Sequence, residues 1–371
     1  MKRKRLGDIA TYINGYAFKP EDRGNEGLPI IRIQDLTGNA YDTGFYAGEY
    51  PSRIEINDGD VLISWSASLG VYVWNRGKAL LNQHIFKVVF DKEPVDKQYF
   101  VYAVRYNLKE MESKTHGATM KHIVKKDFDN TLVPFPSLEK QAEIAGLLQK
   151  VTGIIDARQI ELSRLDELIK ARFVEMFDDG KSPLKTVEEL CSDIVDCPHT
   201  TPKYTGKLKN PAIRTSEIKK GYITWDSMRY VSDEEYEERV SRLRPETGDI
   251  VYGREGTFGN AAILPEGYKF CLGQRVMLLR PDYTKCSSEY LLHAVISDDV
   301  YRQAVGKNHA STVAHVNVKD VKQFKIPLPS FDKQNQFATF VHQVDKSKAQ
   351  VQKSLNETQL LFDSLMQKYF G

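Results

Sequence analysis

The sequence lacks the features that would place it in a membrane or outside the cell. No uninterrupted apolar stretch approaches the ~18 residues that a membrane-spanning helix requires. The basic first residues, MKRKR, are followed by Leu6-Gly-Asp and not by the apolar segment of a signal peptide. Cysteine is scarce, with four residues that all lie in the second half: Cys191, Cys197, Cys271 and Cys286. Their spacings do not match compact zinc-binding pairs, and Cys197-Pro-His199 has no second pair beside it, so we expect reduced thiols, no metal and a cytoplasmic protein.

Motifs for catalysis are also missing. The sequence contains no Asn-Pro-Pro-aromatic or Asp-Pro-Pro-Tyr motif of amino-methyltransferases, no Gly-x-Gly-x-x-Gly loop after a strand and no P-loop lysine motif. Glu217-Ile-Lys219 after Asp196 resembles the carboxylate–lysine cluster of a nuclease, but the corresponding Asp35-Leu-Thr37 of the first half lacks the lysine. We therefore expect no catalytic residues and no cofactor, and any motor activity would belong to another chain.

The charge of the chain is nearly balanced, with 52 basic and 50 acidic residues and a formal net charge of +2. This balance neither requires nor excludes a nucleic-acid partner. A DNA-binding protein this close to neutral has to gather its lysines and arginines on one face.

What the sequence does contain is an internal repeat. The segment Pro134–Gln141 (PFPSLEKQ) returns 193 residues later as Pro327–Gln334 (PLPSFDKQ). Fainter pairs precede it in the same order. They are Pro29–Arg32 with Pro211–Arg214, Asp58–Ile63 with Thr247–Tyr252, Leu81–Gln83 with Leu272–Gln274, and Ala118–Ile123 with Ser311–Val316. The chain is therefore a duplicated half, with insertions in the loops between shared framework pieces.

After each copy of the Pro-x-Pro-Ser motif, apolar residues follow a heptad frame in steps of four and three. In the first copy the frame falls on Ile144, Leu148, Val151, Ile155, Arg158, Leu162, Leu165, Ile169, Arg172 and Met176. In the second copy it falls on Phe337, Val341, Val344, Lys348, Val351, Leu355, Thr358, Phe362, Leu365 and Tyr369. These patterns predict two helices of roughly 40 residues, each about 60 Å long, that pair with each other. The alternative is that each amphipathic helix packs separately on its own domain.

The segments before the helices predict two mixed α/β domains. Val61–Ser64, Val71–Trp74, Ile85–Phe90 and Val276–Arg280 are β-branched or aromatic runs typical of strands. Gln98–Asn107 and Ser288–Gln303 have helical periodicity. Gly59 and Gly248 are expected in turns before a strand. The predicted boundaries are 1–136 and 184–329 for the domains, 137–178 and 330–371 for the helices, and 179–183 for the linker.

This arrangement resembles the specificity subunit of type I restriction–modification systems. The matching pieces are the Gly-Asp-aliphatic strands, the Arg254-x-Gly-x-x-Gly259 loop, the Asn/Gly-Gln step before a strand, the Ala/Ser-Thr-x-x-His-aliphatic segment and, most specifically, the two Pro-x-Pro-Ser-x-x-x-Gln helix starts. The first copy departs at the loop, where Trp65–Gly70 stands in place of Arg254–Gly259. A role assigned to Arg254 does not transfer to Trp65 for this reason.

The resemblance implies two target-recognition domains separated by an antiparallel pair of helices, with pseudo-two-fold symmetry. Each domain would recognise one half of a split double-stranded DNA site, and the helices would set the gap. The implied partners are two methyltransferase subunits, which carry S-adenosylmethionine, and up to two motor-nuclease subunits. The chain itself would be a non-catalytic DNA-binding subunit.

Candidate DNA contacts fall into two groups, because phosphate contacts position a protein and base contacts specify the sequence. The candidate phosphate contacts are Lys19, Arg23, Lys121, Lys125, Lys126, Lys203, Lys219, Lys220 and Lys307. The candidate base contacts are Trp65, Ser66, His199, Thr200, Arg254, Glu255, Thr257 and His309. His122 and His315 occur in both copies and so favour a shared framework role. Each lysine has the alternative of an ordinary solvated surface charge.

Two other functions fit the same sequence. One is a stand-alone DNA-binding regulatory protein without methyltransferase partners. The other is a coiled-coil scaffold whose globular ends bind proteins, which would have no salt-sensitive affinity for DNA.

Overall fold

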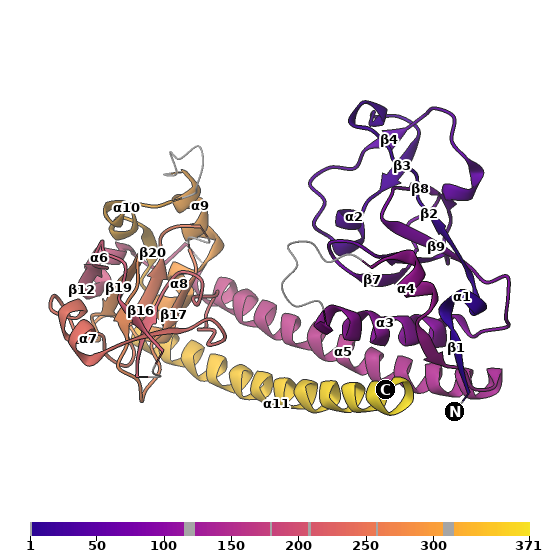
Figure 1. Cartoon of the computed structure of the whole chain (residues 1–371). Helices are drawn as coiled ribbons and strands as arrows, with labels where there is room; N and C mark the ends of the chain where they lie inside the picture. The colour runs from indigo at the N-terminus through magenta and orange to yellow at the C-terminus, as the bar shows by residue number, and fades with distance from the viewer. Residues whose placement is uncertain (1, 115–122, 179, 207–208, 257–258, 307–314) are drawn as a thin grey trace. The chain divides into compact units, whose positions relative to one another are not determined.

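A computed structural model describes residues 2–114, 123–178, 180–206, 209–256, 259–306 and 315–371. The chain forms two compact units, shown in Figure 1. The first unit combines Met1–Gln159 with Lys353–Gly371, and the second is Ile160–Gln352. Each unit therefore contains a globular part and one portion of each of two long helices, α5 (Leu138–Phe177) and α11 (Phe331–Phe370). No described helix is long and apolar enough to cross a membrane.

The globular part of the first unit is a mixture of short strands and helices. Its elements are β1 (Arg3–Arg5), α1 (Leu6–Ile9), β2 (Thr11–Asn14), β3 (Leu28–Ile31), α2 (Ile33–Thr37), β4 (Phe45–Tyr46), β5 (Glu55–Ile56), β6 (Val61–Ser64), β7 (Gly70–Val73), β8 (Ala79–Leu81), β9 (Ile85–Val89), α3 (Lys97–Lys114), α4 (Lys125–Asp129) and β10 (Leu132–Pro134), with 3-10 turns at Pro20–Asp22 and Ser52–Ile54.

The second unit repeats this composition. Its elements are β11 (Leu184–Thr186), α6 (Val187–Leu190), β12 (Cys191–Asp196), β13 (Tyr204–Thr205), β14 (Asn210–Ile213), β15 (Arg229–Val231), α7 (Asp233–Arg239), β16 (Ile250–Gly253), β17 (Ala261–Ile263), β18 (Cys271–Leu272), β19 (Val276–Pro281), α8 (Ser288–Val295), α9 (Asp298–Gly306), α10 (Val318–Lys322) and β20 (Lys325–Pro327).

The two units share one topology. The main sheet has the strand order β2-β9-β6-β7 in the first unit and β12-β19-β16-β17 in the second. In both, a second sheet contains one parallel pair, β3 with β8 and β14 with β18, and a two-stranded pair ties the start of the globular part to the strand before the long helix. The expected mixed α/β fold and internal repeat are therefore confirmed.

The second sheets differ at their edges. In the first unit β5 pairs with β8, whereas in the second unit β13 is added beside β15 and no described strand covers the outer side of β18.

The expected helix over Ser288–Gln303 is interrupted. Residues 288–295 form α8 and residues 298–306 form α9, whereas the corresponding α3 of the first unit is continuous over 18 residues. The hydroxyl of Ser297 accepts a hydrogen bond from the N–H of Val300 (3.3 Å). A side chain that caps the first turn of a new helix favours a break at this point.

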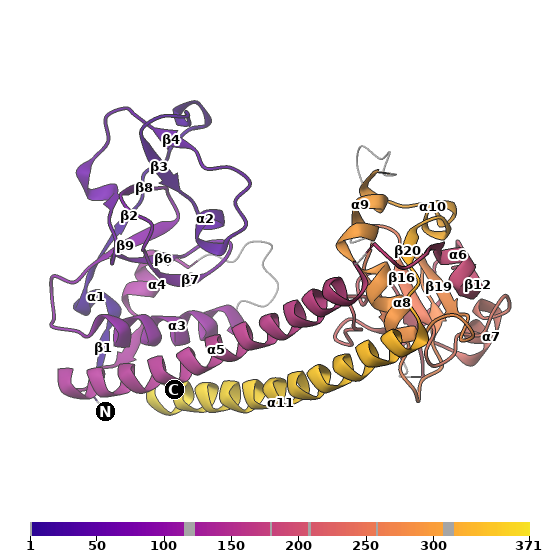
Figure 2. The same cartoon turned by 180° about the vertical axis from the view of Figure 1, so that it is seen from behind.

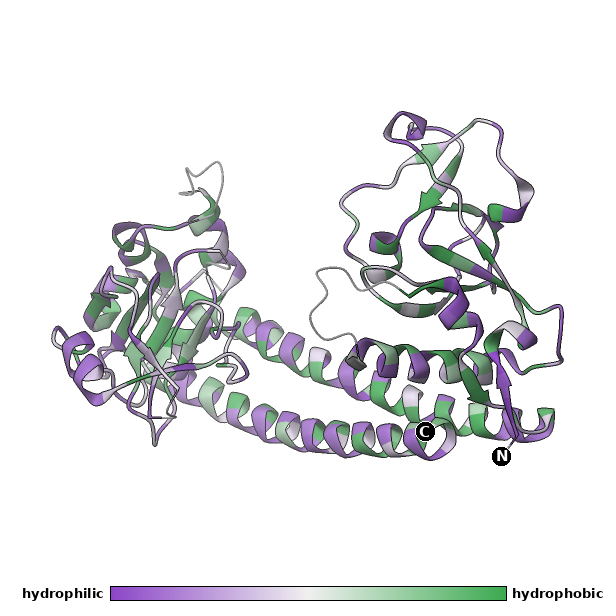
Figure 3. Cartoon of the chain, in the orientation of Figure 1, coloured by the Kyte–Doolittle hydropathy of each residue, from purple (hydrophilic) through white to green (hydrophobic). Residues whose placement is uncertain are grey.

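Buried apolar side chains form the cores between each main sheet and the helices. In the first unit they join β6 and β9 to α3, α5 and α11, and in the second they join β16 and β19 to α8, α5 and α11. Figure 3 shows hydrophobic residues concentrated in the strands, whereas hydrophobic and hydrophilic residues alternate along the two long helices.

The start of each long helix is fixed by the glutamine of its Pro-x-Pro-Ser motif. The side-chain carbonyl of Gln141 accepts from the N–H of Asp96 (2.9 Å), and its amide donates to the carbonyl of Pro136 (3.0 Å). The side chain of Gln334 accepts from the N–H of Ser287 (3.0 Å) and donates to the carbonyls of Pro329 (3.0 Å) and Lys285 (3.1 Å). This buried amide explains why the motif is the most similar part of the repeat.

The two long helices pair in an antiparallel manner, as Figures 1 and 2 show. In the first unit Leu148, near the start of α5, belongs to the same core as Phe370 at the end of α11. In the second unit Phe173, near the end of α5, packs on Phe337 near the start of α11, with ring centroids 5.4 Å apart. The alternative of two helices that pack separately is therefore wrong.

All the frame positions predicted for the helix seam are buried or half-buried. In the last two turns, however, the most buried residues are one position beyond the frame: Phe173 and Phe177 in α5, and Met366 and Phe370 in α11. A straight helix drifts by about 20° per heptad, so four to five heptads accumulate roughly the ~100° that separates neighbouring residues. The seam prediction missed these four residues.

Candidate nucleic-acid interface

The two units use the same residues to build the corner before the second strand of the main sheet. Gly59 and Gly248 have positive φ angles of 88° and 92°, which confirms the expected turns. Asp60 caps its turn by accepting from the N–H of Asn57 (2.9 Å), and it forms an ion pair with Lys87 of β9 (2.9 Å).

In the second unit Asp249 accepts from the N–H of Glu246 (2.8 Å) and pairs with Arg280 of β19 (2.8 Å). The hydrogen bonds that the Arg280 guanidinium donates to Asp249 raise the pKa of Arg280 above its usual value. The Gly-Asp motif therefore has the same framework role in both units, as a turn residue followed by a carboxylate that joins two strands of the main sheet.

Trp65 and Arg254 occupy equivalent positions at the end of the strand after this corner. The N–H of Trp65 donates to the carbonyl of His84 (3.2 Å), and the N–H of Arg254 donates to the carbonyl of Arg275 (3.0 Å). His84 and Arg275 both have left-handed backbone conformations, with φ of 71° and 64°. The backbone at this position is thus the same in the two units although the side chains differ.

The side chains of Trp65 and Arg254 also point to equivalent neighbours. Nε1 of Trp65 donates to Oδ1 of Asn14 at the end of β2 (3.3 Å), and Nη2 of Arg254 donates to Oδ1 of Asp196 at the end of β12 (2.7 Å). The Arg254 side chain is only 11% exposed. The Arg254 side chain is therefore largely buried, and one of its guanidinium nitrogens donates to a carboxylate. The half-buried Trp65 lies at the matching position of the first unit.

The other candidate base contacts lie in different environments. Ser66 is 8% exposed. His199 and Thr200 are exposed, with Nε2 of His199 3.6 Å from Oδ2 of Asp196. Glu255 is half-buried and pairs with Arg275 (2.6 Å). Thr257 and His309 lie outside the described residues, as do Lys121, His122 and Lys307.

Most of the described candidate phosphate contacts are at the surface. Lys19, Lys125, Lys126, Lys203 and Lys220 are exposed, whereas Arg23 and Lys219 are half-buried. Lys125 pairs with Asp129 (2.6 Å), and Arg23 pairs with Asp42 (2.9 Å). Surface ion pairs of this kind are weak, so the cations remain able to contact phosphate.

Each unit also contains an arginine–carboxylate pair, a pairing that the sequence interpretation did not predict. Arg32 and Asp35 lie after β3, and Arg214 and Glu217 lie after β14. In both pairs the carboxylate accepts from the N–H of its arginine, at 2.8 Å for Asp35 and 3.0 Å for Glu217. Burial acts against ionisation of Glu217, but its hydrogen bonds, first from Arg214, keep the pKa of this carboxyl below its usual value. The sequence had drawn attention to the arginines through the shared Pro-x-x-Arg segment of the repeat, and to Glu217 and Asp35 only as a possible nuclease-like cluster.

The described part of the chain contains no cluster of metal ligands, and two of its cysteines are unreactive. No three His, Cys, Asp or Glu side chains of these residues gather where they could hold a metal ion. The four cysteines are free, and burial raises the pKa of Cys271 and Cys286 to about 12. These two thiols are protonated at neutral pH and therefore unreactive.

Comparison with known proteins identifies the family. The family described as "Type I restriction modification DNA specificity domain" matches residues 1–165 and 197–358, which cover the first globular part, the second from residue 197 onward, and portions of both long helices. The chain belongs to this family. Two separate matches in one chain agree with the shared topology of the two units, so this chain contains two type I specificity domains.

Two specificity subunits match nearly the whole of this two-domain chain. The EcoBI specificity subunit of Escherichia coli is 24% identical, with 99% of this chain and 85% of the relative covered. The MjaVIII specificity subunit of Methanocaldococcus jannaschii is 22% identical, with 94% and 89% covered.

Two solved structures have the same fold over nearly their whole length. One is the S subunit of a type I restriction–modification system from M. genitalium, with a TM-score of 0.53, 15% identity, and 100% and 96% of the two chains covered. The other belongs to a study of complex assembly and conformational transition of the type I R-M system, with a TM-score of 0.58, 17% identity, and 99% and 97% covered.

Proposed function

We propose that this chain is the DNA-specificity subunit of a type I restriction–modification system. It recognises a bipartite site in double-stranded DNA, and each globular part recognises one half-site. The observation that carries this proposal is the pair of units with one framework and different exposed loops. Two domains that share a backbone scaffold can bind DNA in the same way, while unlike loop side chains distinguish unlike base sequences.

The chain acts without catalysing a reaction itself. Support comes from relatives that are named specificity subunits. We propose two methyltransferase subunits as partners, because two equivalent units offer two equivalent binding surfaces. Motor-nuclease subunits join the same complex, which acts in the cytoplasm.

The paired helices serve as the spacer between the two recognition domains. The proposed division is 1–136 and 184–329 for the recognition domains, 137–178 and 330–371 for the spacer helices, and 179–183 for the linker. The buried side chains of Gln141 and Gln334 attach the start of each helix to its own domain. A change of helix length would then change the gap between half-sites, as protein geometry sets half-site spacing in dimeric repressors.

Mapping of DNA methylation in a host with and without this chain tests the proposal. The expected result is a set of methylated sites that depends on the chain and consists of two short sequences separated by a constant gap. A methylation pattern that does not change on deletion of the chain would contradict the proposal. Binding of random duplex DNA separates the rivals, since a protein scaffold would have no salt-dependent affinity and a stand-alone regulator would bind DNA but change no methylation.

A further inference from the structure

In both units an arginine directly after β3 or β14 restrains the loop that follows the strand, by a hydrogen bond from its guanidinium to a backbone carbonyl at the far end of the loop. In the first unit Nη2 of Arg32 donates to the backbone carbonyl of Asp42, and in the second Nη2 of Arg214 donates to the carbonyl of Ser227 (2.8 Å). Each arginine is fixed in turn by its carboxylate, Asp35 or Glu217, described above. The two loops therefore start and end at equivalent points of the framework.

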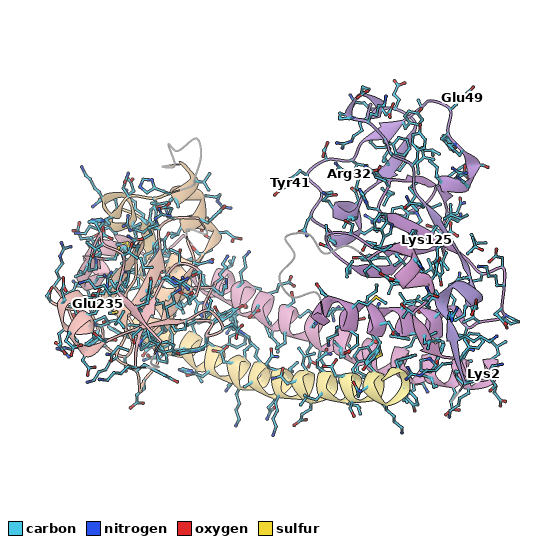
Figure 4. All side chains as sticks on the ribbon, in the orientation of Figure 1. Lys2, Arg32, Tyr41, Glu49, Lys125 and Glu235 are labelled. Carbon is cyan, nitrogen blue, oxygen red and sulfur yellow. The ribbon has the colours of Figure 1, made fainter. Side chains whose placement is uncertain are left out.

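Each loop presents an aromatic side chain next to the carbonyl that the arginine holds. Tyr41 comes one residue before Asp42 and is fully exposed, at 104% of its reference area. Trp225 comes two residues before Ser227, is 37% exposed, and packs on Tyr268 with ring centroids 4.6 Å apart. Figure 4 shows Tyr41 at the edge of the first unit, with Arg32 nearer the body of the domain.

An exposed aromatic ring on a restrained loop is suited to binding. Tyrosine and tryptophan provide a large contact area and lose little conformational entropy, because they have only two side-chain torsions. The hydrogen bond from the arginine restrains the loop before binding, so less conformational entropy is lost when the loop binds a partner. A fully exposed tyrosine contributes nothing to the core of its own unit, so the ring is free to serve a partner.

The charges around Tyr41 are balanced and do not favour a purely electrostatic contact. Asp42 lies between two cations, with carboxylate oxygens 3.2 Å from Arg32 and 2.9 Å from Arg23. The hydrogen bond from Arg32, with the charge of Arg23, holds the pKa of the Asp42 carboxyl below its usual value. The loop therefore carries paired charges, and its distinctive group is the ring.

The two loops differ from each other, and this difference indicates the partner. The stretch from Arg214 to Ser227 is three residues longer than the stretch from Arg32 to Asp42, and it contains Lys219 and Lys220. Two identical protein subunits bound to the two units would require equivalent surfaces. Unlike DNA half-sites require unlike ones, and the candidate phosphate contacts Arg23, Lys219 and Lys220 all lie on or against these loops.

We propose that Tyr41 and Trp225 contact the bases of the two DNA half-sites, one residue for each half-site, through their aromatic faces. This inference rests on the proposed function, since it names the residues that touch DNA within it. The contact is apolar stacking or wedging against bases, and the lysines of the same surface contact phosphate.

The test compares variants of the full chain, in the complex with which it is isolated, on a duplex that carries the mapped site. Tyr41→Ala is expected to weaken binding about tenfold, in the range that removal of an aromatic–base contact produces. Tyr41→Phe keeps the ring and is expected to retain the affinity. A Lys219→Ala, Lys220→Ala double variant should reduce the slope of log K against log salt by about 0.9 for each phosphate that it no longer binds, whereas Tyr41→Ala should leave that slope unchanged.

Half-site specificity provides the second measurement. When the first half-site is scrambled, Tyr41→Ala should lower the affinity no further than the scrambling does. When the second half-site is scrambled, Trp225→Ala should likewise lower the affinity no further. Tyr283→Ala is the matched control, because Tyr283 is an exposed tyrosine of the second unit that lies outside both loops.

Several results would overturn the inference: normal affinity of Tyr41→Ala and Trp225→Ala, an equal loss with Tyr41→Phe, or a changed salt slope with Tyr41→Ala. A wild-type complex without any preference for the mapped site would instead refute the proposed function. The two failures are therefore distinguishable.

Discussion

The buried amide of Gln334 offers the sharpest test of how the second domain is attached to its spacer helix. Its side chain is 0% exposed and makes three hydrogen bonds, one accepted from Ser287 and two donated to Pro329 and Lys285. The bond to Ser287 is made to the N-cap residue that immediately precedes α8. Gln334 therefore joins the start of α11 to the start of the helix on which the core of the unit packs.

Replacement of Gln334 by leucine keeps a similar volume but removes all three bonds. Each hydrogen bond contributes a net stabilisation of about 1 kcal/mol, and a buried backbone N–H or carbonyl left without a partner costs about 1–3 kcal/mol. The expected loss of stability for the second unit is therefore about 3–5 kcal/mol, a large share of the roughly 5–15 kcal/mol that stabilises a typical domain.

Hydrogen exchange followed by mass spectrometry measures this loss within one unit, which matters because a chain of two units does not have to unfold in one step. Amides of α8 and of the first turns of α11 should exchange about two to four orders of magnitude faster in Gln334→Leu, since each 1.4 kcal/mol is a factor of ten. Gln336→Leu, an exposed position on the same turn, is the control. If the two variants exchanged alike, the glutamine would not be the attachment that we infer.

Three further predictions concern pH, recognition and spacing. Burial, with the nearby charge of Lys348, lowers the pKa of His293 to about 4, so this histidine is neutral in the folded protein at pH 7. Its contribution to stability is fully present above the unfolded pKa near 6.5 and is lost as the pH falls towards 4. Acidification from pH 7 to pH 5 should therefore lower the free energy of unfolding of the second unit by about 2 kcal/mol, measured by denaturant unfolding at each pH. A His293→Phe variant should lose less over the same pH range. An identical pH dependence of the two proteins would exclude His293 as the cause. Exchange of residues 1–134 for those of another family member should change one half-site in the methylation map, and a change in both would show that the domain assignment is wrong. Seven residues can be inserted in the heptad frame after both Gln159 and Gln352, where each helix passes from one unit to the other. Since seven helical residues span ~10.5 Å and a base pair ~3.4 Å, the insertion should lengthen the gap between half-sites by about three base pairs. An unchanged gap with intact half-sites would refute the spacer role.

The sequence by itself determined the architecture, because its strongest features are periodic or repeated. The copy of Pro134–Gln141 at Pro327–Gln334 predicted two units with one topology. The heptad frame predicted that two long helices pair, since a sustained apolar stripe has to be covered by a partner. Short β-branched runs located β6, β7, β9 and β19 to within one or two residues.

Tertiary structure alone decided the contacts that join residues distant in the sequence and that leave no periodic signal. Arg254 turns into the fold because Asp196, on another strand, accepts its guanidinium, and the arginines after β3 and β14 reach across their loops to carbonyls ten or more residues away. The ends of the long helices bury Phe173 and Met366 instead of following the heptad frame, because the helices drift relative to a seven-residue repeat. Local patterns fix which segments are helices and strands, whereas the direction in which a polar side chain points depends on the partner that the folded chain brings to it.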